Sequence, residues 1–97
     1  MGCGAPEGGV QVTEAGDEAV VAGEVRRGDQ PVHPAYVRLL DSSGEFVAEV
    51  ATDASGAFRF YAAPGQWTVR ALAPGVAAVD SQVEASRGRI VRITLQM

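Results

Sequence analysis

Residues 52–71 read TDASGAFRFYAAPGQWTVRA, and this stretch contains two turns, each followed by an alternating segment. The residues of both turns, DASG and PG, favour reversal of the chain. After the first turn, large apolar residues return at every second position, at Phe58 and Phe60; after the second, they return at Trp67 and Val69. A period of two is typical of a β-strand with one buried face. The stretch therefore predicts two strands of a sheet structure.

Similar turn residues occur along the chain on both sides of this stretch. Turn residues recur at intervals of about eight to twelve residues, a spacing typical of sandwiches and barrels. They are Gly28-Asp29, Ser42-Ser43-Gly44, Asp53-Ala54-Ser55-Gly56, Pro64-Gly65, Pro74-Gly75 and Arg87-Gly88. Gly or Pro interrupts every candidate helix. We therefore expect an all-β fold, an antiparallel Greek-key β-sandwich of about seven strands over residues 18–97, preceded by a flexible N-terminal arm over residues 1–17, which are rich in Gly.

Alternation divides the side chains of these strands into an inward and an outward set. The inward set is Val21, Gly23, Val25, Val37, Leu39, Phe46, Ala48, Val50, Phe58, Phe60, Trp67, Val69, Ala71, Val79, Ser81, Val83, Val91, Ile93 and Leu95. These side chains would form the core, with Trp67 as its largest contributor.

Two hairpin registers follow from the lengths of the turns. A two-residue loop would pair Leu39 with Phe46, so that both side chains face inward. A three-residue loop would pair Val50 with Phe58 and would place Gly56 in the left-handed conformation.

Composition and charge exclude several classes of function. The chain has 97 residues, a net charge of −4 and a pI of about 4.8, which disfavours non-specific binding to nucleic acid or to an anionic membrane. No apolar run approaches the length of a membrane span, and no signal peptide is recognisable at the start. The single cysteine cannot form an internal disulfide. We therefore expect a cytoplasmic protein; its oligomeric state is left open.

Few residues are candidates for chemistry. Cys3 is the only thiol, and it lies between Gly2 and Gly4, where it could reach a partner's active site and accept a sulfane sulfur; an incidental cysteine is the alternative. His33 is the only histidine, and a metal site needs three or four ligands. We find no complete catalytic constellation, so we expect a non-enzymatic protein without a metal or cofactor.

Outward-facing basic and aromatic residues make a candidate binding patch. They are Tyr36, Arg38, Arg59, Tyr61 and Arg70. If their three strands share a sheet, these residues could bind a small anion or an acidic partner surface. Outward carboxylates favour another interpretation, a solvated face of ion pairs. These carboxylates are Glu24, Glu45 and Glu49.

Four segments carry a resemblance to a known superfamily. They are Val21-Ala22-Gly23-Glu24-Val25, Ala35-Tyr36-Val37-Arg38-Leu39, residues 52–60 (TDASGAFRF) and residues 63–71 (APGQWTVRA). Together they resemble the carboxypeptidase regulatory-like, or transthyretin-like, β-sandwich superfamily. That resemblance implies a sandwich, and it implies functions such as stability module, adhesin repeat, sugar-binding domain or accessory domain.

A narrower resemblance covers nearly the whole chain. It rests on Cys3-Gly4-Ala5-Pro6, residues 37–50 (VRLLDSSGEFVAEV) and residues 58–65 (FRFYAAPG). These segments are similar to a family of small uncharacterised proteins of high-GC bacteria that are associated with sulfur metabolism and often encoded beside a thiosulfate sulfurtransferase. The resemblance implies an accessory domain that docks on such a sulfurtransferase, with Cys3 as a sulfur acceptor. The alternatives are a small-anion or carbohydrate-binding sandwich and a purely structural module.

Overall fold

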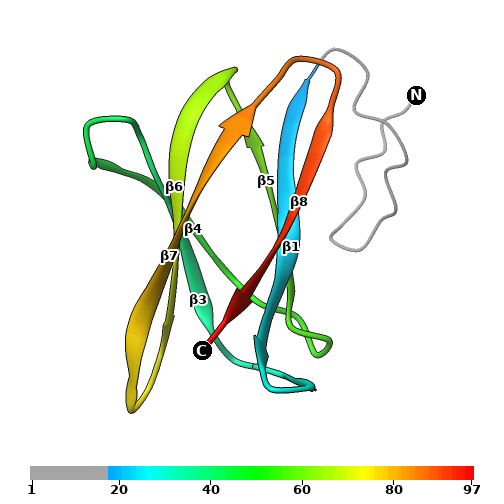
Figure 1. Cartoon of the computed structure of the whole chain (residues 1–97), viewed down its shortest axis with the longest axis vertical. Helices are drawn as coiled ribbons and strands as arrows, with labels where there is room; N and C mark the ends of the chain where they lie inside the picture. Colours follow the sequence, from blue (N-terminus) through cyan, green and yellow to red (C-terminus); the bar gives the residue numbers. More distant parts are fainter. Residues whose placement is uncertain (1–17) are drawn as a thin grey trace.

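Residues 18–97 are described by a computed structural model, in which two β-sheets face each other (Figure 1). Their strands are β1 (Ala19–Arg27), β2 (Gln30–Pro31), β3 (Tyr36–Leu40), β4 (Phe46–Ala51), β5 (Ala57–Ala62), β6 (Gly65–Ala73), β7 (Val76–Ala85) and β8 (Ile90–Gln96). In one sheet β1 pairs with β2, β5 and β8; the second sheet has the order β4-β3-β6-β7. The prediction of an all-β fold with two facing sheets is confirmed. The expected N-terminal arm, residues 1–17, lies outside the described residues.

The β1–β8 pair is parallel, whereas the other strand pairs are antiparallel. Gly23 lies at the centre of β1, opposite Phe58 of β5 and Ile93 of β8. A Cβ atom at Gly23 would overlap the backbone carbonyl oxygen of Ile93 and would lie 3.0 Å from the tip of the Phe58 ring. Only glycine therefore fits where β8 and the Phe58 ring approach β1 so closely.

The core lies between the two sheets and consists mostly of the predicted inward set. Its buried members are Ala19, Val21, Val25, Ala35, Val37, Leu39, Phe58, Phe60, Val69, Ala71, Val83, Ala85 and Leu95. Trp67 packs against this cluster but is only partly buried, and its indole N–H donates to the Ala63 carbonyl at 2.8 Å. Trp67, predicted to be the largest contributor to the core, therefore lies at its margin; aliphatic side chains and two phenylalanines fill most of the core.

The β3–β4 hairpin corrects the first predicted register. Leu39 pairs with Ala48 rather than with Phe46, and the register shifts after Leu39, so that Leu40 pairs with Phe46. The loop is longer than two residues because the Asp41 carboxylate accepts hydrogen bonds from the backbone N–H groups two and four positions later. The shift adds a residue to β4, and Phe46, predicted to face inward, is 58% exposed.

The turn between β4 and β5 repeats this construction. The Asp53 carboxylate accepts hydrogen bonds from the N–H groups of Ser55 and Ala57 at 2.9 and 3.0 Å. Gly56 has a φ of 80°, which confirms the predicted left-handed conformation. However, β4 and β5 belong to different sheets, so the predicted pairing of Val50 with Phe58 is wrong. The turn carries the chain from one sheet to the other.

Candidate functional site

A row of four charged side chains crosses the outer face of the sheet β4-β3-β6-β7. Strand register places Arg38 opposite both Glu49 and Arg70, and it places Arg70 opposite Asp80. The Arg38 Nε donates to Glu49 Oε2 at 2.9 Å, and Arg70 forms two hydrogen bonds to Asp80, at 2.7 and 3.0 Å. Two arginines therefore occupy the centre of the sheet, and each is paired with a carboxylate on the neighbouring edge strand.

Hydrogen bonding rather than burial shifts the pKa values of the pair formed by Arg70 and Asp80. The two hydrogen bonds from Arg70 lower the pKa of Asp80 below its ordinary value, and they raise the pKa of Arg70. All four side chains of the row are well exposed to solvent. Exposed ion pairs of this kind contribute little to the free energy of unfolding, so the stability of the fold does not explain the presence of the row.

Aromatic side chains lie on the same face as this row. Tyr36 is two residues before Arg38 on β3 and is 45% exposed. The Arg38 guanidinium lies over the Phe46 ring, 5.5 Å from its centroid, in a cation–π arrangement. We call the surface formed by the following residues the β3–β6 face. It consists of Tyr36, Arg38, Phe46, Glu49, Arg70 and Asp80.

The predicted patch of five residues is not a single surface. Tyr36, Arg38 and Arg70 lie together on the β3–β6 face. Arg59 and Tyr61 lie on β5, in the opposite sheet. The condition that their strands share a sheet is not met, because the chain crosses between sheets just before β5.

The predicted face of ion pairs is present in part. Glu49 binds Arg38, and Glu24 binds Arg26 along the same strand at 2.8 Å. Sequence reasoning missed Asp80 as the partner of Arg70, although its position in an alternating segment indicated that it faces outward. Alternation within each strand does not specify the register between β6 and β7, which places Asp80 opposite Arg70.

The remaining candidates form no chemical site in the described part of the chain. Cys3 lies outside the described residues. His33 is in an exposed loop, with its Nδ1 2.9 Å from the carbonyl oxygen of Thr52. No group of three or more His, Cys, Asp or Glu side chains within residues 18–97 could hold a metal ion. Over the same range, no helix has the length and apolar character required to cross a membrane.

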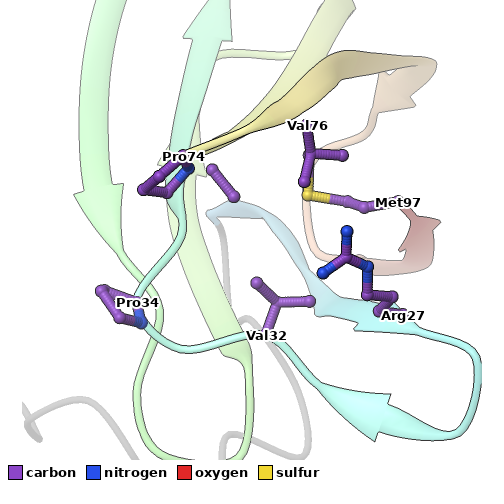
Figure 2. Close-up of a pocket in the computed structure, with 7 residues that line it drawn as sticks. Arg27, Val32, Pro34, Pro74, Val76 and Met97 are labelled. Carbon is purple, nitrogen blue, oxygen red and sulfur yellow. The ribbon is translucent and has the colours of Figure 1, made fainter.

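A pocket opens at one end of the sandwich, beside the end of β6 and the start of β7 (Figure 2). Its volume is about 180 Å³. It is lined by Arg27, Val32, Pro34, Ala73, Pro74, Val76 and Met97. Sequence reasoning did not identify it, since these residues come from four separate segments that only the fold brings together.

Comparison with known proteins gives relatives without an assigned function. A family model described as "Protein of unknown function (DUF1416)" matches residues 3–97. Two uncharacterized proteins of Mycobacterium tuberculosis are each 53% identical over 74 residues, which is 72% of this chain and 74% of theirs. An uncharacterized protein of Mycolicibacterium smegmatis is 61% identical over 56 residues, 57% of this chain and 62% of that protein.

A solved structure has a similar fold. It is the dioxygenase domain of a dioxygenase carbohydrate-binding protein fusion from the cellulolytic bacterium Streptomyces sp. SirexAA-E. The TM-score is 0.65 with 16% sequence identity, over 91% of this chain and 84% of that one. At this level of identity the likeness concerns the fold alone.

Proposed function

The chain belongs to the DUF1416 family of proteins of unknown function, and we propose that it is a non-enzymatic accessory domain of the cytoplasm that docks on a partner protein through the β3–β6 face. The observation that carries this proposal is the exposure of Phe46. The bulge in β4 turns its ring out of the core, and the residue is left 58% exposed, with the ring beside the guanidinium of Arg38. Aromatic residues and arginine are enriched in protein–protein interfaces and supply most hot spots.

One charged side chain of the face, Arg38, can bind an acidic group of the partner. Within residues 18–97, Arg38 donates to Glu49 through Nε, which leaves its terminal amino groups for an incoming acceptor. A carboxylate of the partner could bind these amino groups while an apolar side chain covers the Phe46 ring. Burying the ring would supply affinity, and the charged row would orient the partner.

We take the partner to be a thiosulfate sulfurtransferase, on the strength of the family resemblance. In that complex Cys3 would accept sulfur. The Cys3 thiolate would attack the outer sulfur of the enzyme's cysteine persulfide, the S–S bond of that persulfide would break, and the enzyme's cysteine would leave as a thiolate. A persulfide forms on Cys3 as one is lost from the enzyme, so the exchange needs no external oxidant or reductant.

Docking is tested by measuring the binding of the full chain to a purified thiosulfate sulfurtransferase, using calorimetry. Phe46→Ser should weaken binding at least about tenfold, since a hot-spot aromatic contributes more than 1.4 kcal/mol. Tyr61→Ser is the matched control, because Tyr61 is a similarly exposed aromatic (56%) on the other sheet, and it should leave affinity unchanged. Equal effects of the two variants, or no binding by the wild type, would contradict the proposal.

Sulfur transfer is tested separately, by intact mass after incubation with the sulfurtransferase and thiosulfate. The wild type should gain the mass of one sulfur atom, and Cys3→Ser should gain none. Binding without this gain would remove the carrier role and leave docking intact.

Binding of a small anion or a carbohydrate on this face has weaker support. Two of the five residues predicted to bind such a ligand, Arg59 and Tyr61, are on the opposite sheet.

A further inference from the structure

The end pocket combines apolar walls with a single cationic side chain. Val32 and Pro34 come from the loop before β3, Val76 from the start of β7, and Met97 follows β8. Figure 2 shows the Arg27 guanidinium reaching between Val32 and Met97. The volume of about 180 Å³ is similar to that of an engineered apolar cavity that holds benzene, about 150 Å³.

One wall of the pocket is held in place by a buried threonine. Thr52 is only 3% exposed, and its hydroxyl donates to the Val32 carbonyl at 2.9 Å and accepts from the Ala35 N–H at 3.0 Å. The Thr52 N–H also donates to the Ala35 carbonyl. These bonds fix both ends of the loop that supplies Val32 and Pro34, so the wall is formed before any ligand arrives.

Among the described residues, Arg27 has no acidic partner, unlike the arginines of the β3–β6 face. Arg38 and Arg70 each bind a carboxylate, whereas none of the ion pairs within residues 18–97 involves Arg27. Its planar guanidinium can donate two parallel hydrogen bonds to the two oxygens of a carboxylate.

We propose that this pocket binds a small organic carboxylate with an apolar body about the size of a benzene ring. The carboxylate binds the Arg27 guanidinium at the mouth, and the apolar body contacts Val32, Val76 and Met97. This site is distinct from the docking face, since it lies at the end of the sandwich and shares no residue with the β3–β6 face.

The test uses benzoate as the probe and benzamide as its neutral counterpart of the same shape. Each is titrated into the full chain at neutral pH, and binding is followed by the NMR chemical shifts of the backbone amides of the protein. Benzoate should bind with millimolar affinity, about five-fold tighter than benzamide. The largest shifts should occur at Val32, Val76 and Met97. No saturable binding of benzoate at millimolar concentration, or shifts that map elsewhere, would overturn the proposal.

Variants separate the two halves of the site. Arg27→Gln should abolish the preference for benzoate, whereas Arg92→Gln, which removes an exposed arginine from β8, should retain it. Val76→Phe fills the pocket and should weaken both probes at least about five-fold. A preference that survives in Arg27→Gln, or binding that is unaffected by Val76→Phe, would overturn the assignment.

Discussion

Thr52→Val tests the anchor of the pocket wall most directly. The substitution keeps the β-branched shape and replaces the hydroxyl with a methyl group of similar size. It removes the hydrogen bonds to the Val32 carbonyl and from the Ala35 N–H. Ala35 is fully buried, so its N–H cannot find water as a substitute.

The expected loss follows from these two groups. A buried backbone group without a partner costs about 1–3 kcal/mol, and the Val32 carbonyl is at the lower end because that residue is only partly buried. The added methyl group returns about 0.8 kcal/mol of burial. We therefore expect Thr52→Val to lower the free energy of unfolding by about 2 kcal/mol, which corresponds to a fall in Tm of roughly 10 °C for a domain of this size.

The assay is urea denaturation of the full chain, followed by the fluorescence of the partly buried Trp67. The midpoint should fall while the m-value stays constant. Thr94→Val is the matched control, because Thr94 is an exposed threonine in β8. If the two variants differ by less than about 0.5 kcal/mol, the hydroxyl of Thr52 is not the anchor we describe.

Three further changes test other parts of the structure. Gly23→Ala should lower the free energy of unfolding by about 3 kcal/mol or more, because its Cβ overlaps a carbonyl of β8; a normal urea midpoint would refute the close approach of β1 and β8. Hydrogen bonds from the turn lower the pKa of both Asp41 and Asp53 below the ordinary 3.8, so their stabilisation is complete above pH 3.8 and is lost as the pH falls through the lower, folded-state values. The double variant Asp41→Asn, Asp53→Asn should therefore show a smaller loss of Tm on acidification than the wild type, and an unchanged acid profile would argue against these turns. Asp80→Asn should change stability by less than about 0.5 kcal/mol in urea, because its pair with Arg70 is exposed; a larger loss would mean that the charged row supports the fold.

Local features of the chain were predictable to the extent that they depend on neighbouring residues. Phe58 and Val69 were correctly placed in the core because alternation is a property of each strand alone. The left-handed Gly56 was also predictable, since the turn that contains it is built from consecutive residues. Phe46 was wrongly placed inward because the register shift leaves one extra residue in β4 between Phe46 and Ala48, which breaks the alternation at that point only. Ala48 and Val50, beyond the shift, pack against the core as predicted.

The candidate sites depended on contacts that alternation does not encode. Alternation with a period of two indicates which side chains of a strand share a face. It does not indicate which other strand lies beside that strand. Arg38 and Arg59 have the same local pattern, yet β3 and β5 pair with different neighbours and lie in opposite sheets. The strands, their turns and most of the core were thus present in the order of the residues. The row of charges and the end pocket were not, because both require backbone pairing between segments far apart in the chain, and that pairing is settled by the packing of the whole domain.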